Sequence, residues 1–341
     1  MERRRCLLST QVVEFDIDNY LTIVALEDWL TASLSTNDVE YSIDGNDNWT
    51  TLTAGTASPA INKGQYISFR GNLTPTSSAG VGTFTISKSC DLTGNCNSLL
   101  FGDGAKTNLR LSGKDYAFYK LFYNCSTIKN VSSNFLPATT LASNCYDYMF
   151  SGCSSLTTAP ELPATTLAYE CYQHMFRSCT SLTTAPKLPA TKLTNYCYYQ
   201  MFQGCSKLTT APALPATTLA NGCYQNMFYN CTPLTTAPSI LPATTLADDC
   251  YKNMFYGCSS LITAPQLPAT TLVYSCYYNM FRGCSKLNYI KAMFTTKPSN
   301  SYTYGWVSGV ASSGTFIKNK NATWDVTGTN GIPSGWTVQT I

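Results

Sequence analysis

The chain has 341 residues, of which 44% are hydrophobic and 12% charged, with a formal net charge of +3. This length allows two or three domains. So small a net charge excludes a general electrostatic attraction to nucleic acid or to anionic membranes. No apolar stretch of about 18 residues is present, so the sequence predicts no membrane insertion.

The chain begins with residues 1–15, which we expect to form an N-terminal tail. Polar and acidic residues interrupt its apolar stretch, so no signal peptide is recognised, and we expect synthesis in the cytoplasm. Residues 16–110 contain short runs of alternating β-branched and aromatic residues, separated by turn-forming clusters. This pattern predicts an all-β, immunoglobulin-like sandwich, although residues 26–34 fit a helix as well as a strand.

Two motifs near the end of this region have several interpretations. Cys90 and Cys96 have a spacing that suits a disulfide across a hairpin under oxidising conditions. The segment "FGDGAKT" (101–107) resembles a phosphate loop faintly but lacks its first glycine, so a turn leading into the next region is favoured.

A repeat of about 26 residues dominates the middle of the chain. The motif "CYDYMFSGC" (145–153) recurs in near copies that begin at Cys171, Cys197, Cys223, Cys250 and Cys276. Ile240 adds one residue to a single unit, and a degenerate first unit begins at Ala117. Self-similarity at this period predicts a solenoid over residues 116–295 with about seven coils.

Within one unit the apolar positions follow a helical period. At 100° per residue, Cys145, Tyr146, Met149, Phe150 and Cys153 share one side, which predicts a short inward-facing helix over 145–152. A threonine-rich extended segment follows and predicts a short strand. The fold class expected is therefore an α/β solenoid, followed by a β-rich capping segment over residues 296–341.

The repeated cysteines could serve a metal, a disulfide, a nucleophile or the core. On a helix the two thiols of one unit lie about 12 Å apart, too far to share a zinc ion or to form a disulfide. The single histidine, His174, occupies a position that varies between units, so no base accompanies a nucleophile. We expect no metal, cofactor or catalytic residue. The cysteines predicted to form a buried ladder are Cys145, Cys153, Cys171, Cys179, Cys197, Cys205, Cys223, Cys231, Cys250, Cys258, Cys276 and Cys284.

The motif "MFSGCSSLTTAPELP" resembles the BspA-like leucine-rich-repeat family, in the 26-residue variety of gut bacteria and their phages. The resemblance covers residues 117–294, and residues 306–338 resemble the cap of such proteins. It implies a leucine-rich-repeat solenoid that acts as a non-enzymatic adhesin-like binding protein. The missing signal peptide favours a phage virion or tail component over ordinary surface display. Structural or decoration proteins of a particle and bacterial surface adhesins are the alternatives.

If the periodic positions form the core, recognition depends on the positions that vary outside it. These are rich in tyrosine, amides and arginine, which suit binding of a cell-surface glycan or protein. Further partners expected are a virion component bound through the N-terminal domain and other copies of this chain. The candidate binding face comprises Tyr148, His174, Gln200, Asn226, Asn253, Asn279, Arg177, Tyr229, Tyr256, Arg282, Tyr169, Tyr196 and Tyr274.

Overall fold

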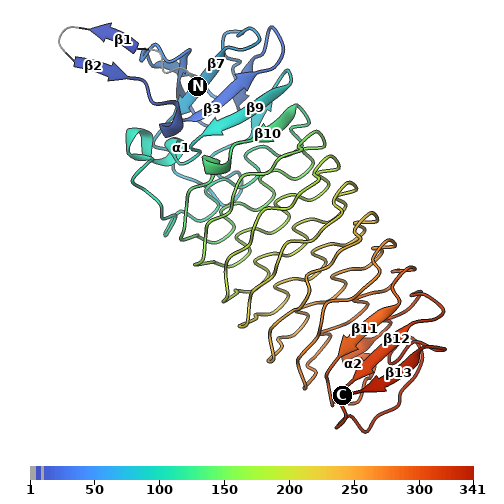
Figure 1. Cartoon of the computed structure of the whole chain (residues 1–341). Helices are drawn as coiled ribbons and strands as arrows, with labels where there is room; N and C mark the ends of the chain where they lie inside the picture. Colours follow the sequence, from blue (N-terminus) through green and yellow to red (C-terminus); the bar gives the residue numbers. More distant parts are fainter. Residues whose placement is uncertain (1–4, 9–10) are drawn as a thin grey trace.

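The computed structural model describes residues 5–8 and 11–341 and shows an elongated molecule with its chain ends far apart (Figure 1). A β-rich body at the N-terminal end, a stack of similar coils and a small sheet follow one another along the chain. Regular strands are concentrated at the two ends of the molecule, and helices are few and short. No helix in the described ranges has the length and hydropathy needed to cross a membrane.

The N-terminal body contains a six-stranded sheet with the order β10-β9-β3-β7-β5-β6 and a separate pair, β4-β8. The central strand β3 is almost wholly buried, because it lies between antiparallel β7 and β9. The bounds are β3 (Leu21–Ala25), β4 (Ala32–Leu34), β5 (Val39–Ile43), β6 (Thr50–Leu52), β7 (Tyr66–Arg70), β8 (Phe84–Ile86), β9 (Cys90–Gly94) and β10 (Ile128–Val131).

Short elements complete this end of the molecule. Within the expected tail, β1 (Arg5–Leu8) pairs antiparallel with β2 (Gln11–Glu14), while residues 1–4 and 9–10 lie outside the described residues. The undecided segment 26–34 forms turns and then β4, whereas 101–107 contains the last residue of a short helix, a 3-10 helix and a turn. The remaining elements are the helix α1 (Ser98–Phe101) and the 3-10 helices η1 (Ile17–Asn19), η2 (Gly102–Gly104) and η3 (Ser133–Phe135).

The disulfide across a hairpin that the spacing of Cys90 and Cys96 would suit does not form. Cys90 begins β9, which runs extended to Gly94 and pairs with β3 over its whole length. A strand advances about 3.3 Å per residue, so the two cysteines are carried apart beyond the reach of a disulfide. Both are free, buried thiols.

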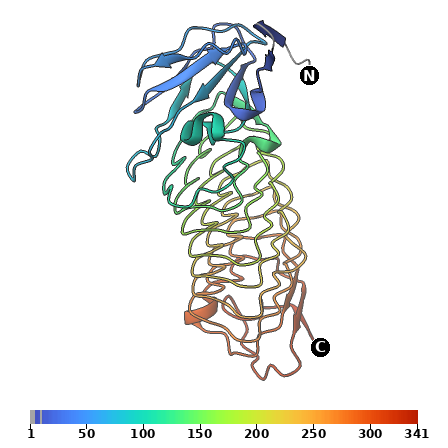
Figure 2. The same cartoon turned by 90° about the vertical axis from the view of Figure 1, so that its left-hand side faces the viewer.

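The N-terminal sheet continues into the first coil of the repeats. β10 belongs to that coil, and it pairs in parallel with β9 through the partners Ile128↔Cys90 and Val131↔Leu92. Figure 2, turned by 90°, shows the coils continuing directly from this body. The sheet therefore supplies a backbone edge on which the stack of coils begins.

The helix expected over 145–152 is wrong. Alternate amides form tight turns, as when the amide of Met149 donates to the carbonyl of Tyr146 (3.2 Å). The amides between them donate to the next coil, as from Phe150 to the carbonyl of Met175 (3.0 Å). An α-helix would use all of these amides internally, so hydrogen bonding between coils replaces it.

Left-handed backbone recurs at every fourth residue of these turns. Asn144, Tyr148 and Gly152 have φ values of 54°, 56° and 78°, and the equivalent residues of the next five coils are also positive. This conformation costs most residues about 1–2 kcal/mol, and glycine and asparagine adopt it most readily. It turns each segment so that its alternate amides meet the neighbouring coil.

The strand expected in each unit is reduced to single parallel bridges. Thr158 bridges Thr184, and Thr236 bridges Thr263. At the ends of the stack the same line of bridges reaches Asn130 of β10 and Tyr289 of β11 (Tyr289–Ala292). These bridges join the first coils to the N-terminal sheet and the last coils to the C-terminal one, with a break between Thr184 and Thr210.

Columns of aromatic rings fill the centre of the stack. Phenylalanines from Phe122 to Phe281 stack with ring centroids 5.5–5.8 Å apart. A parallel column runs from Phe118 through Tyr146 to Tyr277 at 5.6–5.9 Å. Each ring is buried by its equivalents above and below, so a unit gains most of its core from its neighbours.

A parallel three-stranded sheet, β11-β12-β13, closes the C-terminal end (Figure 1). Trp306 is fully buried beneath it and donates its indole N–H to the carbonyl of Gly331 (2.8 Å). The further elements of this end are α2 (Asn300–Thr303), β12 (Thr315–Lys318) and β13 (Thr337–Thr340).

Candidate recognition face

The turn segments of successive coils form one continuous surface, which we name the turn face. It consists of the outward positions of 143–152 and of their equivalents in the other coils, from Tyr116 to Tyr304. All residues of the candidate binding face lie on these segments. Because the coils stack in register, each repeat position becomes a column of side chains.

The expectation that the column of Tyr148 faces solvent is wrong for three of its members. His174 is 6% exposed, and Asn226 and Asn279 are each 8% exposed. Their left-handed backbone directs the side chains along the stack against the neighbouring coils. Tyr148, Gln200 and Asn253 of the same column are half-buried.

His174 is part of a packed cluster. Its ring stacks on Tyr148 with centroids 4.0 Å apart, and its Nδ1 lies 3.3 Å from Oδ1 of Asp147. Tyr199 contacts it edge to face at 5.3 Å. Burial raises the pKa of the Asp147 carboxyl, and interaction with His174 offsets part of this increase. The histidine therefore has a structural partner on each side and no open space for a substrate.

The rest of the candidate face is accessible to solvent. Tyr169 and Tyr274 are 47% and 61% exposed, and Arg282 is exposed. The other members, Arg177, Tyr196, Tyr229 and Tyr256, are half-buried.

Two groups of the predicted residues meet. Tyr229 and Tyr256 stack with centroids 4.6 Å apart and planes at 8°, and the guanidinium of Arg282 lies 5.9 Å from the ring of Tyr256. Tyr169 and Tyr196 meet edge to face at 6.3 Å. These stacked rings fix the positions of their hydroxyl groups and edges on the surface.

Further aromatic residues of the turn face were missed from sequence. Tyr199, Tyr278 and Tyr304 share the column of Asp147, and the last two stack at 5.1 Å. Tyr119 and Tyr123 lie on the degenerate first coil, beside Tyr148. Aligning "AFYKLFYNC" with "CYDYMFSGC" column by column would have found them, because the alignment places Tyr119 beside Asp147 and Tyr123 beside Ser151 in the repeat.

The cysteine ladder lies on the opposite side of the turn segments from the turn face. All twelve of its cysteines are 0% exposed. The thiol of Cys153 donates to the carbonyl of Phe122 (3.1 Å), and the equivalent bond recurs in the later coils. Burial raises the pKa of Cys223, Cys231 and Cys276 to about 12, so these thiols stay protonated and unreactive near neutral pH.

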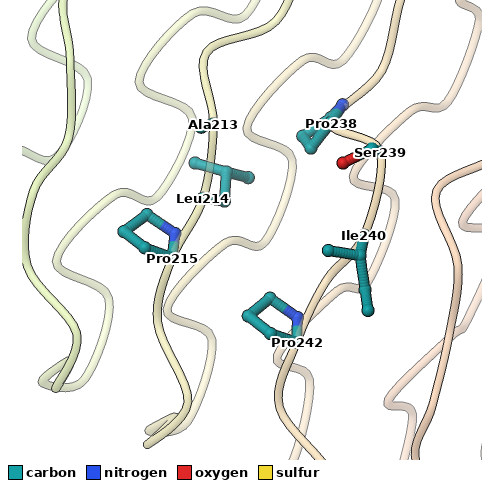
Figure 3. Close-up of a pocket in the computed structure, with 7 residues that line it drawn as sticks. All are labelled: Ala213, Leu214, Pro215, Pro238, Ser239, Ile240 and Pro242. Carbon is teal, nitrogen blue, oxygen red and sulfur yellow. The ribbon is translucent and has the colours of Figure 1, made fainter.

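The described residues around the candidate face do not form a metal site. Within the described ranges, no three His, Cys, Asp or Glu side chains come together as metal ligands. A small hollow does occur between two coils where Ile240 is inserted (Figure 3). It contains none of the candidate residues, and its lining is Ala213, Leu214, Pro215, Pro238, Ser239, Ile240 and Pro242.

Comparison with known proteins identifies the repeats. The model of the BspA type leucine rich repeat region matches residues 114–235 and 223–305, with six copies. None of the curated proteins matches the chain. A crystal structure of a leucine-rich repeat protein from Bacteroides ovatus is 13% identical, with 65% of this chain and 77% of that chain covered and a TM-score of 0.19. Since the matched repeats span more than half of the sequence, the chain belongs to the BspA type leucine-rich-repeat family.

Proposed function

We propose that this chain is a non-enzymatic recognition protein, a solenoid whose turn face binds a cell-surface glycan or protein. Leucine-rich repeats of this type are generally binding repeats, and the family suggests a protein-binding or adhesion role. The observation that carries the proposal is the accessible stack of Tyr229, Tyr256 and Arg282. Stacked tyrosines offer large contact area with little conformational entropy to lose on binding.

The proposal places the chain on a phage virion or tail, attached through its N-terminal β-sandwich. Trp29 supports attachment by this domain, because it is 73% exposed on a left-handed backbone with φ of 64°. Strained positions and exposed tryptophans are both enriched at binding sites. Mass spectrometry of purified virions tests this part, and absence of the chain there would favour a bacterial surface adhesin instead.

Binding of purified protein to envelope fractions and to a glycan array tests recognition. We expect saturable binding that the double substitution Tyr229→Ala and Tyr256→Ala weakens by about tenfold or more, as for other aromatic hot spots. Ile262→Ala is the control, because this side chain is 48% exposed but lies outside the turn face. Failure to bind any fraction or glycan would contradict recognition and favour a structural or decoration role in a particle.

A further inference from the structure

The first coil of the stack contains a cluster of tyrosines around one ammonium group. Nζ of Lys120 lies 4.8 Å from the ring centroid of Tyr119 and 5.5 Å from those of Tyr123 and Tyr148. The ring of Tyr148 is nearly perpendicular to the other two, at 88° and 82°. We name these three rings the aromatic cage, since a cation within about 6 Å of a ring centroid is attracted to its face.

The ammonium of Lys120 interacts with the cage and, at longer range, with the Asp147 carboxylate, whose pKa its charge lowers. None of the salt bridges among the described residues includes Lys120. Interaction with the Tyr119 hydroxyl raises the pKa of Lys120, so the group stays charged. Tyr123 is 38% exposed, and Lys120 itself is only half-buried. The cage therefore opens to solvent and holds its occupant at the surface.

The backbone gives no reason for a lysine at this position. Lys120 has a φ of 56° and belongs to the column in which later coils carry Asn226, Asn253 and Asn279. Asparagine adopts this left-handed conformation more readily than lysine. The lysine is therefore explained by what its side chain meets, which is the set of rings that only this coil and the next provide.

We propose that the aromatic cage is a binding site for an alkylammonium group, above all a quaternary one, and that Lys120 is its displaceable occupant. A primary ammonium is strongly hydrated, whereas a quaternary ammonium has no N–H group and is well suited to contact with aromatic faces. The proposal rests on the proposed function in one respect, because the recognised cell surface supplies the ammonium group.

Titration of the full chain with tetramethylammonium chloride tests the site, with sodium chloride at equal ionic strength as the reference. Proton NMR of the probe reports entry into the cage, since aromatic rings shift its methyl resonance upfield. We expect saturable shifts with the unmodified chain and at least about fivefold tighter binding by Lys120→Asn, which removes the competing cation. Three later coils have asparagine in this column (Asn226, Asn253 and Asn279), so the substitution is compatible with the backbone.

Two further substitutions separate the cage from the rest of the surface. Tyr123→Leu in the Lys120→Asn background removes the most exposed wall and should abolish the saturable shift. Ile262→Ala removes a 48% exposed apolar side chain outside the turn face and should leave binding of the probe unchanged. The proposal is overturned if Lys120→Asn folds normally but gives no saturable shift. It is also overturned if only that variant binds, because Lys120 is then a permanent structural occupant.

The ammonium could belong to a lipid headgroup or to a substituted surface polymer. Phosphatidylcholine vesicles and choline-coupled dextran distinguish these sources, with phosphatidylglycerol vesicles and plain dextran as references. Binding to either one, lost with the Tyr123→Leu variant, supports the proposal, and binding to neither overturns it. Envelope binding without probe binding would contradict the cage alone, and probe binding without envelope binding would contradict the proposed function alone.

Discussion

The hydroxyl groups of Tyr146 and Tyr198 are buried without a hydrogen-bond partner among the described residues. Both rings belong to the stacked column, with neighbouring centroids 5.6–5.8 Å apart, so neither can turn its hydroxyl toward water. A buried polar group that lacks a partner costs about 1–3 kcal/mol. These two tyrosines keep the column of rings at this cost to stability.

Tyr146→Phe and Tyr198→Phe should therefore each raise the free energy of unfolding by about 1 kcal/mol, because the ring stack remains and the unpaired hydroxyl is removed. Urea denaturation followed by circular dichroism measures the change. Tyr20→Phe serves as a control of opposite sign, since its hydroxyl donates to Asp103 (2.8 Å) and its loss should destabilise the protein. Destabilisation by both core substitutions would show that these hydroxyls have partners.

Which individual residues lie open to solvent could be predicted only in part. The variable positions do lie on one surface, and Tyr169, Tyr274 and Arg282 are exposed. His174, Asn226 and Asn279 are buried because side chains in the left-handed column pack along the stack. Their burial depends on contacts between coils, which residue type and period do not reveal.

The turn segments depend on a backbone conformation that most residues adopt at a cost. Ser178 has a φ of 58° in the column where Gly152, Gly204, Gly257 and Gly283 occur. Its side chain is exposed, so little packing would be lost on its removal. The effect of Ser178 on the stability of the protein is therefore expected to come mainly from backbone strain rather than from side-chain contacts.

Ser178→Gly should raise the free energy of unfolding by up to about 1 kcal/mol, because glycine adopts a left-handed conformation without strain. The measurement is thermal unfolding by calorimetry at a fixed scan rate. In contrast, Ser181→Gly should lower stability, since Ser181 has no positive φ and glycine only adds freedom to the unfolded chain. Equal effects of both substitutions would argue against strain at Ser178.

Sequence periodicity locates these segments but does not identify their conformation. If the chain rotates by 90° per residue, the side chains of Cys145, Met149 and Cys153 point in the same direction. If it rotates by 100° per residue, as in an α-helix, their directions differ by up to 80°. Nine residues are too few to distinguish a period of 4 from 3.6, and both place the same side chains inward. The recurring glycine and asparagine at every fourth position was the available signal for turns, because a helix disfavours glycine and places no residue at positive φ.

Across the whole molecule, the buried thiols couple stability to alkaline pH. Their folded pKa values are raised, as for Cys223 at about 12, whereas an unfolded thiol ionises near pH 9. Above that pH the unfolded chain releases protons that the folded chain retains. Each such thiol then lowers the free energy of unfolding by up to about 1.4 kcal/mol per pH unit.

The summed effect of the cysteine ladder should produce steep cooperative unfolding between about pH 9 and 10 at 25 °C. Circular dichroism during an alkaline titration measures it, with a reductant present to prevent oxidation of released thiols. The stability contribution is complete below pH 9 and is lost as the pH rises. A native spectrum that persists above pH 11 would mean that the thiols are not buried as described.

At this scale the presence of the repeats could be predicted from the period, and the family model matches six copies of them. The junction between β10 and β9 could not be predicted. Parallel pairing joins segments that are far apart in sequence, and the residues of neither strand indicate which strand it pairs with. The expected boundary between the domains therefore cuts through a sheet that they share.

The insertion at Ile240 shows how such a molecule can change in length. The extra residue is accommodated at a proline-rich corner, where Ile240 bridges Gln266 and remains 39% exposed. The aromatic columns pass this point undisturbed, with Phe228 and Phe255 5.5 Å apart. Every coil presents the same packing surface to the next coil. Duplication of a unit would therefore lengthen the molecule and add one row of outward side chains. Reach and specificity can thus evolve together while both terminal structures stay unaltered.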